Sequence, residues 1–197
     1  MNTRTTMTDL TDPTLPVNNG KRVAILATNG FEESELRVPR EALLNAGAFV
    51  DLISLEAGAI KGWKDGDWGD SEPVDRAVAD ADPADYDALL LPGGVMNPDK
   101  LRTNPDAVAF VRAFFDQHKP VAAICHGPWM LAEANVLRGR KLTSYPSIRT
   151  DLINAGAEWV DAEVVVDNGL ITSRSPKDLP AFNAKMLEEL AEGVHQP

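Results

Sequence analysis

Residues 121–131 have the sequence Val-Ala-Ala-Ile-Cys-His-Gly-Pro-Trp-Met-Leu, which indicates the fold class. Its first four residues form an apolar run, which is typical of a strand buried on both faces of a sheet. Pro128 suits the first turn of a helix, where a missing N–H costs nothing. The stretch therefore predicts a strand, a sharp turn at Cys125 and a helix.

Cys125 is the only cysteine, and Ala123 and Gly127 lie two residues to either side of it. This is the small-x-nucleophile-x-small spacing of a nucleophile elbow, in which a tight turn leaves no room for larger side chains. The turn places the sulfur near a helix N-terminus, whose free N–H groups favour the thiolate. We interpret Cys125 as a nucleophile. The alternative is a small buried hydrophobic residue, as most lone cysteines are.

The composition is that of an ordinary globular protein, with 197 residues, 44% hydrophobic and 25% charged. A net charge of -11 and a pI near 4.7 argue against binding to nucleic acid or to anionic membranes. A single cysteine cannot form an internal disulfide, residues 1–20 lack the apolar core of a secretory signal, and no apolar run is long enough to span a bilayer. We expect a cytoplasmic protein with no nucleic-acid or membrane partner.

Residues 1–20 are rich in Thr, Asp, Asn and Pro and are expected to form a disordered arm before one domain at 21–197. Buried strands are predicted at 22–28, 49–55, 88–91 and 121–124. Helices are predicted after Phe31, with Leu36, Leu43 and Leu44 on the buried side and Gly47 at the end, and at 105–117. The alternation indicates an α/β fold with a mostly parallel sheet.

The remaining segments complete this pattern. Residues 56–85 contain Trp63 and Trp68 in a polar, glycine-rich setting and predict an irregular hairpin, in which the tryptophans are expected to pack without a chemical role. Further elements are expected in order: a helix at 129–134, a strand at 141–144, a helix at 148–155, strands at 163–166 and 170–173, and a closing helix at 180–192.

Chemically useful groups gather where the predicted strands end, which is the edge at which such sheets bind ligands. Glu32, Glu33 and Glu35 follow the first strand, and three carboxylates are more than helix capping needs. Pro92-Gly93-Gly94 follows another strand, and its backbone N–H groups could form an oxyanion hole. His126 could transfer protons beside the thiol, although a helix-start histidine is the simpler explanation.

No metal site is expected, because the chain has no second cysteine and no close histidine pair. His118 falls in a predicted turn and His195 in the C-terminal tail. A class I glutamine amidotransferase would share the elbow but needs a His-x-Glu downstream of the cysteine. Here His195 is followed by Gln196 and Pro197, which argues against that class.

From about Lys21 to the last helix, the sequence resembles the ThiJ/PfpI superfamily and, within it, the PfpI-type intracellular protease and protein deglycase branch. The resemblance rests on several motifs in a fixed order. These are FEESEL at 31–36, LLLPGG at 89–94, AICHGPW at 123–129, the segment 137–167, and SRSPKDLPAF at 173–182.

The resemblance implies a flavodoxin-like three-layer α/β sandwich with Cys125 as nucleophile and His126 as general acid/base. It further implies that the Glu35 carboxyl hydrogen-bonds to the sulfur and is partly protonated, because two adjacent negative charges are costly. Asp99 corresponds to an acid that orients the histidine of a neighbouring subunit, although the segment after the glycine pair is one residue longer here.

Two further groups of residues take roles from the same resemblance. The backbone near Gly93, Gly94 and His126 would form the oxyanion hole. Tyr145 would edge the pocket, or could equally belong to the core.

The function expected from this resemblance is that of a stress-related cysteine hydrolase, assembled as a homodimer or larger homo-oligomer and working without a cofactor. Cys125 would attack a peptide carbonyl or a glyoxal-derived adduct on protein amines. The alternative is a redox sensor or chaperone-like stress protein, in which Cys125 is oxidised to a sulfinic acid that Glu35 stabilises. His126 favours the enzyme, since a pure sensor does not need it.

Overall fold

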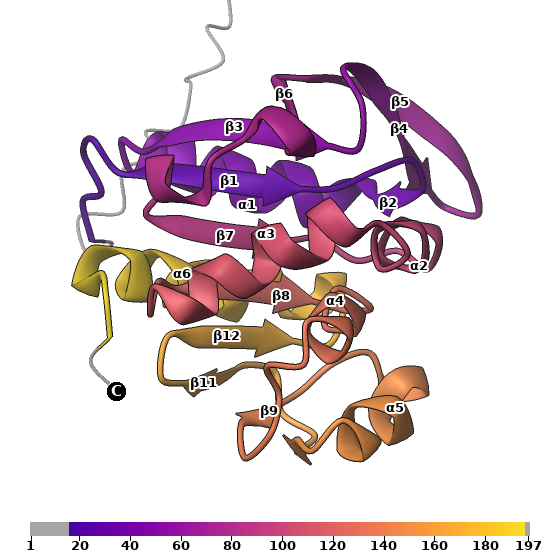
Figure 1. Ribbon diagram of the computed structural model, residues 1–197, viewed down its shortest axis with the longest axis vertical. Coiled ribbons are helices and arrows are strands. Elements are labelled where there is room, and N and C mark those ends of the chain that lie inside the picture. The colour runs from indigo at the N-terminus through magenta and orange to yellow at the C-terminus, as the bar shows by residue number, and fades with distance from the viewer. Residues whose placement is uncertain (1–15, 196–197) are drawn as a thin grey trace, which may run out of the picture.

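The computed structural model describes residues 16–195, and its centre is a seven-stranded sheet in the order β11–β12–β8–β7–β1–β3–β6 (Figure 1). All neighbouring strands are parallel except β11 and β12, which are antiparallel. The strands are β1 (Arg22–Leu26), β3 (Phe49–Ser54), β6 (Arg76–Ala77), β7 (Ala88–Leu91), β8 (Val121–Ile124), β11 (Val165–Asp167) and β12 (Leu170–Ser173). The predicted α/β fold with a mostly parallel sheet is confirmed.

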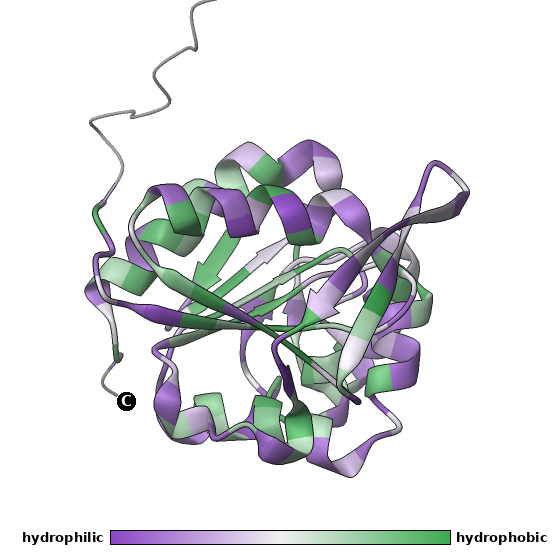
Figure 2. Ribbon diagram, turned by 90° about the horizontal axis from the view of Figure 1, so that it is seen from above, coloured by the Kyte–Doolittle hydropathy of each residue, from purple (hydrophilic) through white to green (hydrophobic). Residues whose placement is uncertain are grey.

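Helices cover both faces of this sheet, which gives three layers, and hydrophobic residues run along the strands between them (Figure 2). Successive strand residues point to opposite faces, so that Val23 and Ile25 pack with one helix layer while Ala24 and Leu26 pack with the other. One layer consists of α1 (Glu33–Asn45) and α6 (Leu179–Glu192). The other contains α3 (Pro105–Asp116), α4 (Trp129–Glu133) and α5 (Arg149–Asn154).

Helix α1 carries part of the site, and its buried face was predicted with one error. Leu36 and Leu43 are fully buried, but Leu44 is 53% exposed. One residue along a helix turns the side chain by about 100°, which here moves Leu44 from the buried stripe to the solvent-exposed side. Gly47, with φ +88°, lets the chain leave the helix as expected.

The hairpin predicted at 56–85 is confirmed for residues 58–74, as β4 (Gly58–Lys64) and β5 (Asp67–Val74), with a register irregularity between Lys61 and Trp63. The rest of that segment instead adds β6 to the main sheet and forms two turns of 3₁₀-helix. A short strand, β2 (Phe31–Glu32), pairs in parallel with β4 and makes a separate three-stranded sheet. Trp63 and Trp68 meet edge to face, with ring centroids 5.4 Å apart. The pairing with β2 brings the hairpin beside the first turn of α1.

Other elements differ from the sequence prediction in detail. The predicted strand at 141–144 is reduced to β9 (Lys141–Leu142), and it pairs with β10 (Glu158–Trp159) outside the main sheet. Helix α2 (Met96–Leu101) was not predicted. Single turns of 3₁₀-helix lie at Val78–Asp80, Pro83–Asp85, Pro146–Ile148 and Pro176–Asp178.

Of the arm predicted at 1–20, residues 1–15 lie outside the described residues. Asn18 is buried: its backbone N–H donates to the Ala46 carbonyl and its side-chain amide to the Leu187 carbonyl. The packed body therefore includes Asn18. Within residues 16–195, no helix combines the length and the apolar character that a membrane crossing needs.

Candidate active site

The strand-to-helix turn at Cys125 has the predicted elbow geometry. Cys125 adopts φ +63°, a left-handed conformation that non-glycine residues rarely take and that is often retained at functional sites. A Cβ at Gly127 would lie 2.5 Å from the Leu91 carbonyl oxygen, so only glycine fits there. The Cys125 N–H donates to the Ser173 carbonyl, which joins the turn to β12.

Glu35 lies beside the sulfur, completely buried on the first turns of α1. Its Oε2 accepts the backbone N–H of Gly93 at 2.8 Å, and its side chain is hydrogen-bonded to Cys125. Burial raises the pKa of Glu35 from 4.5 to about 8. The hydrogen bond from Gly93 lowers this pKa, and the nearby charge of Glu32 raises it. Glu35 is therefore a neutral acid at pH 7.

Burial also raises the pKa of the Cys125 thiol, which is 7% exposed, and a charged Glu35 would raise it further. The backbone N–H groups of Gly94 and His126 hydrogen-bond to the sulfur and lower the pKa. The Glu35 Oε1 atom is buried and has no hydrogen-bond partner of acceptable geometry. Because α4 begins only at Trp129, these local donors stabilise the thiolate instead of the predicted helix dipole.

His126 is in reach of the thiol, with Nδ1 3.2 Å from Sγ. Its Nε2 lies 3.1 Å from the Ser147 hydroxyl, a residue that the sequence did not single out. The Tyr145 ring stacks on the imidazole at 4.8 Å, so Tyr145 edges the pocket and does not belong to the core. Burial lowers the pKa of His126, which keeps the ring neutral at pH 7 and able to accept a proton.

The Pro92-Gly93-Gly94 turn passes close to both α1 and the elbow. Side chains would not fit, because a Cβ at Gly93 would lie 2.6 Å from that of Cys125 and a Cβ at Gly94 would clash with the Gly30 carbonyl oxygen. The amide of buried Asn97 donates to the carbonyls of Pro92 and Gly93 and holds the turn. The Gly93 N–H donates its hydrogen bond to Glu35, and the N–H groups of Gly94 and His126 face the sulfur.

A cleft of about 670 Å³ opens over the sulfur. Cys125, His126, Glu35, Gly94 and Tyr145 line it together with residues that the sequence did not assign to the site. These are Gly30, Glu32, Trp63, Val95, Met96, Ser147 and Pro176. No sequence signal indicated Trp63, because the pairing of β2 with β4 brings it to the cleft.

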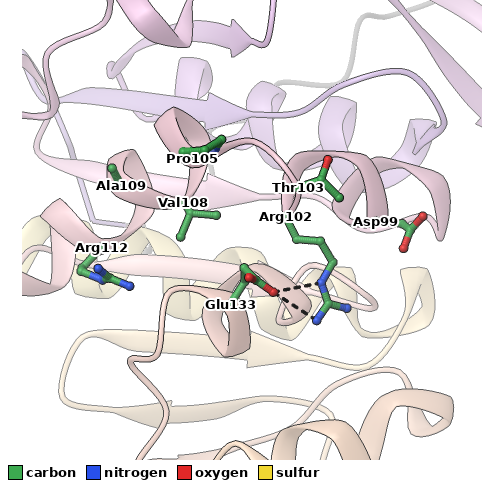
Figure 3. Close-up of a pocket in the computed structure, with 8 residues that line it drawn as sticks. All are labelled: Asp99, Arg102, Thr103, Pro105, Val108, Ala109, Arg112 and Glu133. Atoms are coloured by element: carbon green, nitrogen blue, oxygen red, sulfur yellow. Dashed lines mark hydrogen bonds and ion pairs between the residues drawn. The ribbon is translucent and has the colours of Figure 1, made fainter.

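Asp99 lies elsewhere in the same chain. It is exposed on α2 and lines a separate surface groove of about 700 Å³ with Arg102, Arg112 and Glu133 (Figure 3). In that groove Arg102 pairs with Glu133 and covers the Trp129 ring. None of the residues that line this groove also lines the Cys125 cleft.

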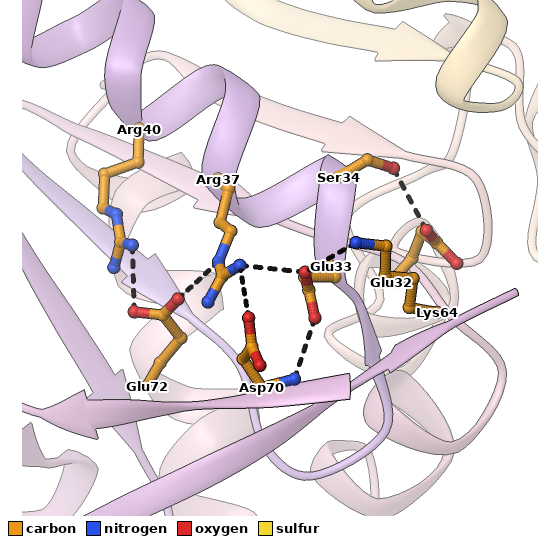
Figure 4. A network of polar contacts seen from close by, with 8 residues as sticks. All are labelled: Glu32, Glu33, Ser34, Arg37, Arg40, Lys64, Asp70 and Glu72. Atoms are coloured by element: carbon orange, nitrogen blue, oxygen red, sulfur yellow. Dashed lines mark hydrogen bonds and ion pairs between the residues drawn. The ribbon is translucent and has the colours of Figure 1, made fainter. Parts of the chain in front are cut away.

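The three glutamates at the start of α1 have different surroundings, and Figure 4 shows those of Glu32 and Glu33. Buried Glu33 accepts from Arg37 at 2.8 Å and from the backbone N–H of Asp70 at 2.9 Å, and Arg37 also reaches Glu72 on β5. Glu32 accepts from the Ser34 hydroxyl at the edge of the cleft. Glu33 thus fastens the hairpin to α1, and Glu35 alone reaches the sulfur.

Comparison with known proteins gives one consistent result. Residues 21–189 match the DJ-1/PfpI family. The chain is 47% identical to deglycase PH1704 of Pyrococcus horikoshii, over 86% of this chain and 99% of that protein. It is 47% identical to general stress protein 18 of Bacillus subtilis, over 85% of this chain and 96% of that protein. The crystal structure of Drosophila melanogaster DJ-1beta superposes on this chain with a TM-score of 0.79 at 32% sequence identity. The match covers 87% of this chain and 90% of the Drosophila chain.

Proposed function

The chain belongs to the DJ-1/PfpI family, and we propose that it is a stress-related cysteine hydrolase of the PfpI type that removes glyoxal-derived adducts from protein amines. The observation that carries this proposal is the set of groups around one sulfur. Cys125 is hydrogen-bonded to a neutral Glu35, faces two backbone N–H groups and lies 3.2 Å from a histidine nitrogen. These are a nucleophile, an acid, an oxyanion site and a base.

The first step is attack of the Cys125 thiolate on the carbonyl carbon of the adduct, which forms a C–S bond and an oxyanion. The Gly94 and His126 N–H groups that face the sulfur are placed to hold the oxyanion. Because Cys125 is buried at the base of the cleft, a small carbonyl reaches the sulfur more easily than a peptide bond with chain on both sides. This favours the adduct over a peptide substrate.

The carbon bonded to sulfur next loses its proton while the C–N bond of the neighbouring carbon breaks, which releases the amine and leaves an enediol that tautomerises to a thioester on Cys125. Water then hydrolyses this thioester, which breaks the C–S bond, releases the hydroxy acid and restores the thiol. If the Ser147 hydroxyl accepts the Nε2 proton of His126, the Nδ1 lone pair points at the thiol and can take its proton. The same proton can be returned to the departing amine nitrogen. Glu35 is the second proton carrier, since its pKa of about 8 is close to neutral pH.

The proposal includes a homodimer or larger homo-oligomer in the cytoplasm. Asp99 is exposed in a groove that does not belong to the Cys125 cleft of its own chain, so it is available to a histidine of a second copy. A symmetric homo-oligomer repeats one surface on each copy, so the same groove would serve the cleft of every neighbouring copy.

The decisive experiment measures turnover of wild type and Cys125→Ala on methylglyoxal, on a methylglyoxal-modified amine and on an unstructured peptide. We expect wild type to release amine and lactate from the modified amine, and Cys125→Ala to lose at least about 1,000-fold in rate. Faster cleavage of the peptide would move the substrate assignment to peptides. No cysteine-dependent turnover, with ready oxidation of Cys125 by peroxide, would replace the hydrolase with the sensor.

A further inference from the structure

A cluster of possible metal ligands lies at the C-terminal end of α6, away from the active site. In the described part of the chain, Glu189, Glu192 and His195 each offer one ligand atom, and these atoms lie within 4.8 Å of one another. Glu189 and Glu192 are one turn apart on α6, and His195 follows in the segment 193–195 after the helix ends. Neither the fold nor the proposed reaction uses these groups.

The backbone holds His195 in place over α6. Gly193, with φ +83°, ends the helix and turns the chain back. The His195 N–H donates to the His118 carbonyl at 2.9 Å. The imidazole packs on Gly169, where an added Cβ would come within 2.6 Å of the ring. These contacts lie at the amino ends of β8 and β12, at the opposite edge of the sheet from Cys125.

The two inner ligand atoms lack ordinary partners. Glu189 is 7% exposed, and its Oε2 is 2.9 Å from the Nε2 of His195. Both atoms are buried, and neither makes a hydrogen bond of acceptable geometry. Buried polar atoms are almost always satisfied, so this pair needs an explanation. Two ligands of one tetrahedral Zn²⁺ with bonds of about 2.1 Å would lie about 3.4 Å apart, so a shift of about 0.5 Å from the present 2.9 Å separation would admit the ion.

We propose that Glu189, Glu192 and His195 bind one divalent transition-metal ion, with Zn²⁺ as the best match. An imidazole combined with carboxylates suits Zn²⁺, whereas Mg²⁺ and Ca²⁺ prefer oxygen ligands alone. Two carboxylates would balance the charge of the ion.

Several cationic side chains near the cluster bear on its affinity. Lys185 is paired with Glu188 at 2.6 Å, so its charge is largely neutralised. Lys21 Nζ lies 3.7 Å from the position that a Cβ would take at Gly193, and it would compete with the ion. Lys119 and Arg140 line a cavity together with His195 and add to the positive charge near the cluster. The ion would fasten segment 193–195 to α6 and to the β11–β12 turn, and so stabilise the fold without a part in catalysis.

The test uses the full chain carrying Cys125→Ser, which removes the active-site thiol as a rival ligand. Zn²⁺ is titrated by calorimetry after chelator treatment, and thermal unfolding is followed with Zn²⁺ and with EDTA. We expect one ion per chain and a higher Tm with Zn²⁺. His195→Ala, Glu189→Gln and the exposed Glu192→Gln should each weaken binding about tenfold or more.

Two controls make the test specific. Glu188→Gln, on the same helix end but paired with Lys185, should leave the affinity unchanged, and Lys21→Gln should tighten it. Absence of Zn²⁺ binding, or binding that persists in both His195→Ala and Glu192→Gln, would overturn the proposal. In that case Glu189 and His195 form a simple ion pair, and His195→Ala lowers the Tm equally with Zn²⁺ and with EDTA.

Discussion

The two sides of α1 use the same residue type in opposite ways. On the side of the β4–β5 hairpin, Glu33 is buried between Arg37 and the Asp70 N–H, with Lys64 Nζ 3.7 Å away (Figure 4). On the elbow side, Glu35 is buried with one backbone donor and the Cys125 thiol, and its pKa rises to about 8.

The difference between the two glutamates lies in their partners and not in their burial. A buried carboxyl paired with arginine becomes part of the structure, whereas one without a cation holds a proton that chemistry can use. Substitutions that remove one carboxyl at a time can test this comparison.

The largest effect is expected from Glu35→Gln. The amide can still accept the Gly93 N–H, but it cannot give up a proton, so turnover should fall by about 100-fold or more. The pH profile of Cys125 alkylation should lose the ionisation near pH 8, because the pair no longer contains the carboxyl. An unchanged alkylation profile would remove Glu35 from the site.

The same substitution should stabilise the protein at neutral pH. The folded pKa of Glu35, about 8, is above its usual 4.5, so the folded state binds the extra proton. The resulting stability is fully present below pH 4.5 and is lost as the pH rises to about 8. At pH 7 this loss is about 3 kcal/mol, and Glu35→Gln avoids it. Urea unfolding of both proteins at pH 5 and pH 8 measures the difference, and equal pH dependence would contradict it.

Glu33→Gln should show the reverse pattern. It leaves Arg37 with Asp70 and Glu72 only, and should reduce the free energy of unfolding by about 1–2 kcal/mol, less than for a fully buried pair because Arg37 is partly exposed. Turnover per folded molecule should stay within about twofold of wild type, since Glu33 does not touch the cleft. A loss of turnover as large as that of Glu35→Gln would break the distinction between the two sides.

The smallest effects are expected around His126. Ser147→Ala removes the partner of Nε2 and should lower turnover severalfold while leaving Cys125 alkylation nearly unchanged. Full activity of Ser147→Ala would mean that the stacked Tyr145, and not Ser147, orients His126.

Asp99→Ala should also lower turnover without changing Cys125 alkylation, but only in the assembled oligomer. Full activity of Asp99→Ala would rule out an acid contributed by a second copy.

The sequence was sufficient where one local constraint decides the structure. The elbow follows from Ala123 and Gly127, and φ +63° at Cys125 agrees with it. Short-range spacing could not identify Ser147, which reaches His126 from a separate turn 21 residues later. It could not tell Glu33 from Glu35, because the distinction comes from Arg37, Asp70 and the hairpin.

Other errors have similarly physical causes. Helix α2 was missed because Asn97 and Pro98 are residues that favour a turn. In the structure the Asn97 side chain is buried, where it accepts a hydrogen bond from the Thr28 N–H and donates one to the Pro92 carbonyl. Leu44 was placed inside because it is apolar, although it lies one residue from the buried stripe. Trp63 was assigned no chemistry, and only the pairing of β2 with β4 places it at the cleft.

The most direct test of the central claim, that Glu35 is a neutral acid beside the sulfur at pH 7, is the infrared carbonyl band of protonated carboxylic acids. Wild type at pH 7 should show this band, Glu33→Gln should retain it, and Glu35→Gln should lose it. The band should also fade in wild type as the pH rises through about 8. Its absence from wild type at pH 7, or its persistence in Glu35→Gln, would contradict the account.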